Sequence, residues 1–277
     1  MKANLQTPAA RESGGPRSLE RLLALFDVLS TAPNGSSLAE LSTLLGSPKS
    51  SLLNVLRPLV SEGFLVHDGS SYRLGPAIFR LASGVLHAWY LPRVMRPLMQ
   101  QLARQTGESV MLSVSDVEKA AMIYVDIVNG PHPVRYQIPV GTVRPLFAST
   151  AGRVLLAHSE AGWRRQYLAG INLDAGLATP LTKAALKKEI QQIHAQGIAW
   201  SMDVYMTGLS AVAAPLFGDG GRCVACLNIA GPTDRFRTHL ERFRDLVKAA
   251  AGKGSKLIAA AEASPAAGEA ARLARAS

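Results

Sequence analysis

Between residues 18 and 74, apolar positions recur first at helical spacing and then in two short runs. Residues 18–31 and 38–45 each place leucines three and four apart, which predicts two amphipathic helices. A third helical pattern covers residues 48–60. Residues 64–74 then read as two strand-like runs around Asp68-Gly69, a dipeptide typical of tight hairpins. Three helices followed by a hairpin predict a winged helix-turn-helix, which makes DNA the first partner to consider.

The residues between these patterns predict where the helices begin and end. Ser37 and Glu40 have the spacing of a capping box, in which side chain and backbone satisfy each other's hydrogen bonds. Gly46 suits the left-handed position after a helix. We expect Ser47 to cap the next helix, with Pro48 at its first position, where a missing N–H costs nothing. Gly46-Ser47 is therefore the predicted turn before the recognition helix.

The predicted recognition helix has an apolar stripe and a polar face. The polar face and the hairpin supply the candidate DNA-binding residues, which are Lys49, Ser50, Ser51, Asn54, Arg57 and Arg73. Lysine suits a phosphate or guanine, asparagine an adenine edge, and arginine a guanine or phosphate. An ordinary solvated helix face or exposed turn is the alternative for any one of them. Pro58 predicts a kink or an early helix end.

The remaining pattern predicts two linker helices and a mixed α/β domain. Residues 77–106 are helical in pattern, with interruptions at Leu91-Pro92 and at Pro97. The predicted strands cover residues 109–115, 120–128, 133–139, 198–202, 209–217 and 222–230. The predicted helices cover residues 149–158 and 182–196, and a last one begins near 235. This order predicts an α+β fold, with an antiparallel sheet flanked by helices.

Five segments follow from these patterns. They are a disordered arm at 1–16, the winged helix-turn-helix at 17–76, linker helices at 77–106, the α+β domain at 107–262 and a disordered tail at 263–277. The tail is rich in alanine, glycine and charge, which disfavours a packed core.

Composition narrows the class of protein. The 277 residues suffice for two domains, and 48% hydrophobic residues indicate globular folding. We find no run of about 18 apolar residues and no secretory signal pattern, so we expect no membrane span and a cytoplasmic protein. The net charge is +10, but residues 1–80 hold eight Lys and Arg against six Asp and Glu. The excess charge therefore does not locate the DNA-binding surface.

Catalytic, metal and cofactor sites are not predicted. Cys223 and Cys226 form a C-x-x-C pattern, but residues three apart on a strand are expected to face opposite sides. The chain offers no second cysteine pair for zinc, and two buried small side chains explain the pattern. Ser210 lacks the glycine that a nucleophile elbow needs two residues later. An enzyme is therefore the less favoured alternative, and we expect neither a metal nor a cofactor.

Three segments resemble the IclR family of bacterial transcriptional regulators. They are LAELSTLLGSPKSSLLNVLRPLVSEGFLVHDGSSYRLG at 38–75, VGTVRPLFASTAGRVLLA at 140–157 and GLSAVAAPLFGDGGRCVACLNIAGP at 208–232. The resemblance implies a GAF-like effector-binding domain and a homodimer or homotetramer. It also implies binding to a palindromic double-stranded DNA operator that a small metabolite modulates. A ligand-independent DNA-binding architectural protein is the alternative.

The resemblance also places the effector pocket. One wall would be Ser149, Thr150, Ala151 and Gly152, where a helix begins and its unpaired amides suit an anion. The positions implied for the other wall are Ser201, Ala211, Asn228 and Ala230, with Asp203 as the alternative to Ser201. Arg144 and Arg153 flank the loop, and for both we favour a structural salt bridge or solvent exposure over a ligand contact.

The second wall departs from the family pattern that binds very small oxo-acids. Those members place Asp, Cys and two Ser there, whereas this chain has alanine at 211 and 230. The lost polar partners and the larger cavity disfavour a small hydrophilic ligand. Trp200, Tyr205 and Met206 are candidates for apolar surface, although packing in the core or at an interface is the favoured alternative for each one taken separately. We therefore expect a larger, flatter effector, such as an aromatic carboxylate.

Overall fold

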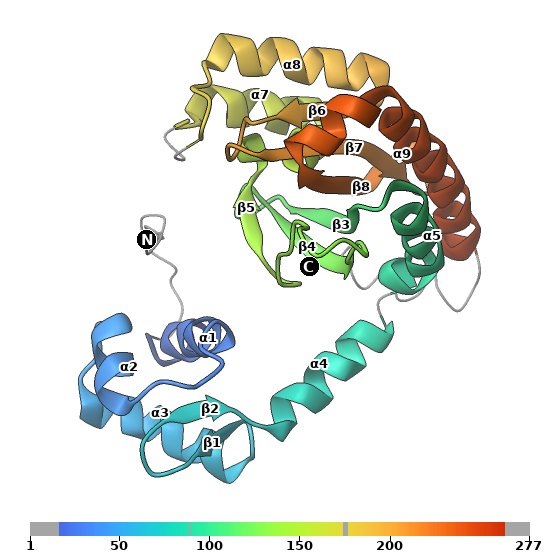
Figure 1. The fold of residues 1–277 in the computed structure, drawn as a ribbon. Helices are drawn as coiled ribbons and strands as arrows, with labels where there is room; N and C mark the ends of the chain where they lie inside the picture. The colour runs from blue at the N-terminus through green and yellow to red at the C-terminus, as the bar shows by residue number, and fades with distance from the viewer. Residues whose placement is uncertain (1–16, 89, 174–176, 264–277) are drawn as a thin grey trace. The chain divides into compact units, whose positions relative to one another are not determined.

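The computed structural model describes residues 17–88, 90–173 and 177–263 (Figure 1). The chain divides into two compact units, Met1–Ala88 and Trp89–Ser277. The predicted arm at 1–16 lies outside the described residues, and so does the predicted tail apart from Ala263.

The described residues of the N-terminal unit, 17–88, form three helices, a two-stranded hairpin and a fourth helix. These are α1 (Arg17–Ser30), α2 (Leu38–Leu44), α3 (Lys49–Ser61), β1 (Leu65–His67), β2 (Tyr72–Leu74) and α4 (Pro76–Ala88). The leucines of the helical patterns meet in one core with Leu65 and Tyr72 of the hairpin. A single bridge between Ser36 and Tyr72 adds the chain before α2 to the hairpin. The winged helix-turn-helix is thus confirmed.

Local chemistry explains most of the helix ends. The capping box at the start of α2 is present, with the Ser37 amide donating to Glu40 at 2.7 Å and the Glu40 amide donating to the Ser37 hydroxyl at 3.3 Å. Gly46 has a φ of +56°, as a left-handed residue after a helix requires. The expected cap at Ser47 was wrong. Its hydroxyl donates back to the Leu45 carbonyl, and α3 follows Pro48 without a side-chain cap.

Pro58 does not end α3 early, which was one of the two effects predicted for it. The helix runs on to Ser61, and the Glu62 amide donates to the Pro58 carbonyl at 2.9 Å. Pro58 lacks the N–H that would donate to the Asn54 carbonyl four residues earlier. The loss is confined to the last turn of the helix, and the carbonyl of Pro58 still accepts a hydrogen bond. The side chains of Leu52 and Leu56 are buried, and Val55, Leu59 and Val60 pack against the same core, as the stripe predicts.

The C-terminal unit is built on a six-stranded antiparallel sheet in the order β5-β4-β3-β8-β7-β6. The strands are β3 (Ser109–Asp116), β4 (Ala121–Val128), β5 (Val143–Pro145), β6 (Ala199–Met202), β7 (Leu209–Phe217) and β8 (Cys223–Pro232). The helices are α5 (Tyr90–Thr106), α6 (Thr150–Ala157), α7 (Ala161–Gly170), α8 (Lys183–Gln196) and α9 (Thr233–Glu262). Two short 3₁₀ turns, η1 (Leu146–Ala148) and η2 (Asp219–Gly221), complete it.

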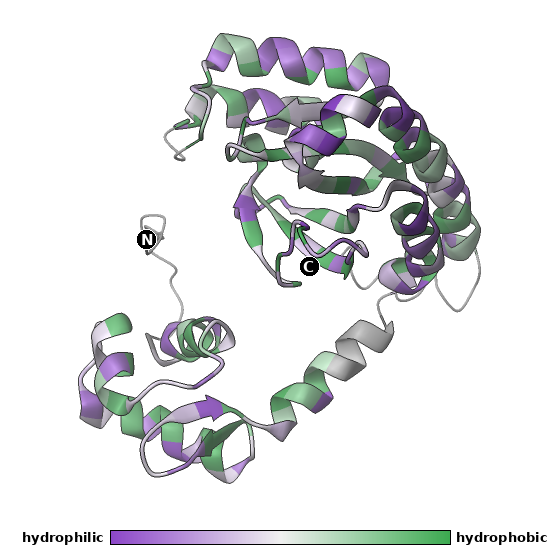
Figure 2. Ribbon diagram, viewed as in Figure 1, coloured by the Kyte–Doolittle hydropathy of each residue, from purple (hydrophilic) through white to green (hydrophobic). Residues whose placement is uncertain are grey.

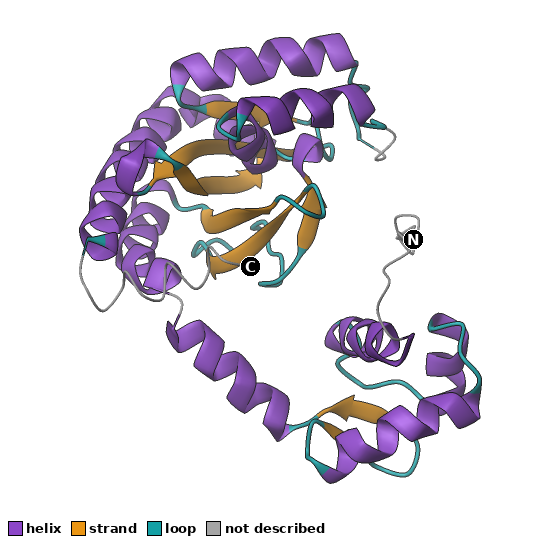
Figure 3. Ribbon diagram, turned by 180° about the vertical axis from the view of Figure 1, so that it is seen from behind, coloured by secondary structure: helices purple, strands orange, loops and turns teal. Residues whose placement is uncertain are grey.

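Helices cover both faces of this sheet (Figures 1 and 3). Helices α5 and α9 pack on one face, where they form a core around Met95, Leu227 and Phe236. Helix α6 packs on the other face, backed by α8, and its core includes Met111, Leu156 and Ile190. Figure 2 shows the resulting pattern, in which apolar residues dominate the central strands while α8 carries polar residues between apolar ones. The α+β fold class is confirmed.

Three local predictions in this unit were wrong. Residues 133–139 form no strand, because prolines at 131, 133 and 139 remove the donors that a strand pair needs. Residues 143–145 pair with β4 instead and form the sheet edge. Helix α7 was not predicted, since none of its residues is buried and its apolar pattern is weak. Pro92 and Pro97 do not interrupt α5, which runs through both.

The two cysteines do not face opposite sides of the sheet. A register shift between Leu216 and Phe217 makes Val224 an extra residue, so the alternation is broken there. Cys223 and Cys226 consequently contact the same core on the α6 face. Both thiols are free, and burial raises the pKa of Cys223 to about 12 and that of Cys226 well above its usual value. Both cysteines thus act as small apolar side chains, as the sequence indicated.

Candidate functional site

The candidate DNA-binding residues of α3 lie off its buried stripe. The side chains of Lys49, Ser50, Asn54 and Arg57 are exposed, and Ser51 is half-buried. Lys49 and Ser50 occupy the first turn of α3, the end of a recognition helix that reaches base edges. The surface needed to read a DNA groove is therefore accessible on this helix.

Asp68 organises the hairpin turn that forms the wing. Its carboxylate accepts the amides of Ser70 and Ser71 and both of their hydroxyls. It also pairs with Arg73 at 3.0 Å. The amides of Ser71 and Ser70 are the main cause that holds the pKa of Asp68 far below its usual value. The candidate Arg73 is thus held by Asp68 and remains about half exposed, at 46%.

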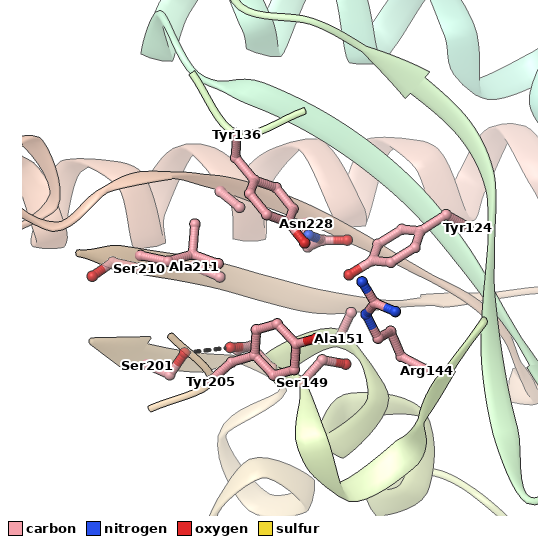
Figure 4. A pocket seen from close by; sticks show the side chains of 13 residues that line it. Tyr124, Tyr136, Arg144, Ser149, Ala151, Ser201, Tyr205, Ser210, Ala211 and Asn228 are labelled. Atoms are coloured by element: carbon pink, nitrogen blue, oxygen red, sulfur yellow. Dashed lines mark hydrogen bonds between the residues drawn. The ribbon is translucent and has the colours of Figure 1, made fainter. Parts of the chain in front are cut away.

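A small pocket, with a cavity volume of about 40 Å³, opens between the first turn of α6 and the sheet (Figure 4). Seven of the ten predicted effector-binding residues line it, namely Ser149, Thr150, Ala151, Ser201, Ala211, Asn228 and Ala230. The lining also includes Tyr124, Tyr136, Arg144, Tyr205, Leu209 and Ser210.

Strand register brings the sheet wall together. Ser201 on β6 lies opposite Ala211 on β7, which lies opposite Ala230 on β8. Side chains at directly paired positions share a face, so these three form a row across the pocket floor. Asn228 lies two residues along β8 from Ala230 on the same face, and it is 3% exposed.

The other wall is the start of α6. Ser149 caps the helix, and its hydroxyl accepts the amide of Gly152 at 3.0 Å. Thr150 and Ser201 share a hydrogen bond of 2.6 Å across the pocket, drawn as a dashed line in Figure 4. The first amides of α6 have no acceptor within the helix, so this wall favours negative charge.

Three predicted effector-binding residues lie outside the pocket lining. Gly152 packs against the backbone of Leu146, where a Cβ would lie 2.2 Å from the carbonyl oxygen. Trp200 has the opposite orientation on β6 from Ser201, and its ring lies under the Arg244 guanidinium at 4.0 Å. Asp203 accepts hydrogen bonds from Gly208 and Thr233 on the α9 side.

The two arginines that flank the loop have different roles. Arg153 forms the structural salt bridge that we favoured, donating to Glu189 at 2.8 Å and to the Phe147 carbonyl at 2.8 Å. Arg144 instead lines the pocket, with its guanidinium 5.6 Å from the Tyr205 ring centre. No salt bridge of Arg144 occurs among the described residues.

Of the pocket tyrosines, Tyr205 was a candidate for apolar surface, whereas Tyr124 and Tyr136 were missed because their strand and loop positions carried no motif. Tyr124 comes from β4, and Tyr136 comes from the segment that follows it. Burial raises the pKa of both phenols, with the charge of Arg144 opposing the rise. Neutral phenol groups around one guanidinium give the pocket an aromatic wall with a single cationic point.

A winged helix-turn-helix and an α+β unit with a pocket are the architecture of a DNA-binding transcriptional regulator. The chain matches the model of the bacterial transcriptional regulator IclR C-terminal domain over residues 83–256 and that of the IclR helix-turn-helix domain over residues 18–69. It belongs to the IclR family and is a DNA-binding transcriptional regulator of this type.

Individual relatives agree with this assignment. The HTH-type transcriptional regulator BhcR of Paracoccus denitrificans is 30% identical, over 82% of this chain and 81% of that protein. A crystal structure of an IclR regulator from Alicyclobacillus acidocaldarius has a TM-score of 0.76 at 25% identity, covering 88% and 99% of the two chains. An IclR homologue from Microbacterium hydrocarbonoxydans, complexed with 4-hydroxybenzoate, has a TM-score of 0.78 at 20% identity, covering 88% and 99%.

Two kinds of feature are absent from the described residues. Within them, no cluster of three or more His, Cys, Asp or Glu side chains is arranged to hold a metal ion. Over the same ranges, no helix combines the length and apolar character needed to cross a membrane.

Proposed function

We propose that the chain is a regulator whose operator binding is modulated by an aromatic carboxylate held in the α6 pocket. The observation that carries this proposal is Arg144, the only lysine or arginine among the residues that line the pocket. A guanidinium pairs with a carboxylate through two parallel hydrogen bonds, and the first amides of α6 favour the same charge.

The rest of the pocket favours a flat apolar ligand body. Tyr124, Tyr136 and Tyr205 supply ring faces and edges against which an aromatic ring can pack. Ala211 and Ala230 offer no polar side chain where a small oxo-acid would need partners. The 4-hydroxybenzoate bound by the Microbacterium homologue supports an aromatic acid here.

We propose further that α3 reads the operator through the major groove. Lys49, Asn54 and Arg57 are exposed on one helix and carry donors suited to base edges and phosphates. Ser50, Ser51 and Arg73 would add phosphate contacts that fix the position of the domain. The N-terminal unit has little net charge, so affinity would depend on these contacts and on several copies binding together.

A homodimer or homotetramer supplies those copies. Helix α1 exposes Leu19 and Leu23, at 50% and 57%, four residues apart on one face. Helix α4 exposes Phe79 at 75% and Leu81 at 61%. Large apolar side chains that remain exposed on one small unit favour contact with a second copy. A two-fold dimer matches a palindromic operator.

The test is binding of benzoate and its hydroxylated derivatives, compared with glyoxylate and pyruvate, by calorimetry and thermal shift. We expect Arg144→Met to weaken aromatic carboxylate binding about 10- to 100-fold, because a buried carboxylate loses its charged partner. Operator binding without ligand should not change. Arg222→Met is the matched control, because Arg222 is exposed and does not line the pocket.

Two results would contradict the proposal. One is stabilisation by glyoxylate or pyruvate but by no aromatic acid. The other is unchanged benzoate affinity in Arg144→Met. An operator-binding assay with and without the acids separates a ligand-responsive regulator from a ligand-independent architectural protein.

A further inference from the structure

The first turn of α9 fixes the turn that carries Tyr205 into the pocket. The Thr233 amide donates to the Gly208 carbonyl at 2.9 Å, and the Thr233 hydroxyl donates to the Asp203 carboxylate at 2.8 Å. Asp203 also accepts the Gly208 amide at 2.7 Å. Residues 203–208 are thus closed on themselves by Asp203 and attached to α9 by Thr233.

Asp203 adopts a backbone conformation that needs such support. Its φ is +58°, in the left-handed region that side chains other than glycine adopt at a cost. Its hydrogen bonds to Thr233 and Gly208 hold the pKa of the carboxyl below its usual value, so the carboxylate is ionised at neutral pH. Because an ionised carboxylate only accepts, the Thr233 hydroxyl is the donor of this pair.

The same turn of α9 also holds the segment that carries Tyr136. Arg235 donates through Nη2 to the Val134 carbonyl at 3.1 Å and to Glu108 at 2.7 Å. Glu108 is fully buried, and its carboxylate reaches this place because Gly231 has no side chain. A Cβ at Gly231 would lie 2.0 Å from the Glu108 carboxylate. The residues between β4 and β5 are therefore fastened to α9 at Val134, two residues before Tyr136.

Arg144 interacts with both of these tyrosines. Its guanidinium lies over the Tyr205 ring, and its charge lowers the pKa of Tyr136 against the effect of burial. Among the described residues no carboxylate forms a salt bridge with Arg144. Its guanidinium donates to the neighbouring Val143 carbonyl at 3.4 Å, and the Tyr205 ring supports it from one side. Thr233 and Arg235 themselves do not line the pocket.

We propose that Thr233 and Arg235 are positioning residues for effector binding. The first turn of α9 holds the two loops, the loops hold Tyr205 and Tyr136, and the tyrosines orient Arg144 toward the effector carboxylate. The proposal rests on the proposed function, because it assigns this orientation a role in carboxylate recognition. Thr233 and Arg235, at the start of the helix on the opposite face of the sheet, would thus influence how tightly the pocket binds its effector.

The test compares benzoate with benzamide, a neutral ligand of the same shape. In Thr233→Val, we expect benzoate affinity to fall about five- to tenfold, because Asp203 loses one of its hydrogen-bond donors, Ser210 loses its partner, and Tyr205 and Arg144 lose their fixed geometry. Benzamide affinity should change less than twofold. Thr233→Ser keeps the hydroxyl and should restore benzoate binding. Thr238→Val is the matched control, since Thr238 is exposed on the same helix and bonds only within it, to Asp234.

A double-mutant cycle separates positioning from general loosening of the fold. In an Arg144→Met background, Thr233→Val should cause no further loss of benzoate affinity, because the group that it positions is already gone. Arg235→Lys should behave in the same way, since lysine keeps the charge beside Glu108 but lacks the fork that also reaches Val134. Calorimetry at millimolar ligand measures the weak variants.

The possible outcomes distinguish failure of the positioning role from failure of the proposed function. Equal losses for benzoate and benzamide, or losses that add to that of Arg144→Met, would overturn the positioning role while leaving the aromatic carboxylate in place. Full benzoate affinity in both Thr233→Val and Arg235→Lys would overturn it as well. If the unaltered protein binds neither benzoate nor its hydroxylated derivatives, the proposed function fails, and the positioning role fails with it.

Discussion

At the residue scale, the wall of the pocket formed by α6 depends on a close contact between the start of this helix and the backbone of η1. Gly152 lies in the first turn of α6 and touches the backbone of Leu146 in η1. Any side chain there would displace η1 or the helix start. Gly152 was expected to contact the effector, but its contribution is to let Ser149 and Thr150 stand at the pocket edge.

We expect Gly152→Ala to destabilise the protein by about 2–3 kcal/mol, because the added Cβ overlaps backbone atoms that cannot move independently. Urea unfolding measures the change. Gly252→Ala is the control. Gly252 lies in α9, and a Cβ added there would meet no neighbouring atom within 4 Å, so alanine should stabilise by about 0.5–1 kcal/mol. Equal effects of the two changes would contradict the overlap at Gly152.

At the scale of elements, the two helices that back the pocket meet at a pair of imidazoles. His158 follows α6, and its ring centre lies 5.0 Å from that of His194 on α8 and 5.3 Å from that of Phe217. His158 Nε2 is buried without a hydrogen-bond partner. Burial, and then the nearby His194 and Arg164, lowers the pKa of His158 to about 4.

This pKa predicts an acid-sensitive fold. The unfolded chain protonates His158 near pH 6.5, whereas the folded protein resists protonation until about pH 4, so stability falls as the pH is lowered through this window. In His158→Phe, we expect the loss of unfolding free energy between pH 7 and 5 to shrink by about 1 kcal/mol, a value reduced for the partial exposure of the ring. His239→Phe, at an exposed position, should retain the original pH dependence.

Most of the elements that are bordered by a local sequence signal, such as a capping box or a turn residue, could be predicted from the sequence. The capping box at Ser37, the glycine at 46 and the hairpin turn at Asp68 are local signals, and each element they border is present. The pocket row of Ser201, Ala211 and Ala230 depends on strand register, yet the family resemblance located it. The strand predicted at 133–139 failed because prolines there remove backbone donors, and helix α7 was missed because its apolar pattern is weak.

The candidate site was predicted less completely than the fold. Tyr124 and Tyr136 reach the pocket only through the pairing of β4 with its neighbours and the path of the loop after it. Nothing in their spacing along the chain indicates a shared cavity. Arg144 was named, but a structural salt bridge or solvent exposure was favoured for it, because a sequence does not show whether a carboxylate lies within reach.

At the scale of the whole molecule, the number of subunits in the oligomer should control the affinity for the operator. We expect the double change Leu19→Glu and Leu23→Glu to shift the protein to monomers in analytical ultracentrifugation and to lower operator affinity at least tenfold, because charge on this face opposes dimer contact. Leu257→Glu places the same charge at another exposed leucine, on α9, and should change neither. A double variant that stays oligomeric and binds its operator normally would exclude α1 from the interface.

Helix α9 has one more property that its length determines. Its 30 residues span about 45 Å, and its last residue, Glu262, accepts a hydrogen bond from Tyr90 at the start of α5. Thr233, which holds the turn beside the pocket, and Glu262, which contacts Tyr90 next to the unit boundary, therefore lie at opposite ends of one helix. A tilt of about 2° at Thr233 would move the Glu262 end by about 1.5 Å, roughly half a hydrogen-bond length.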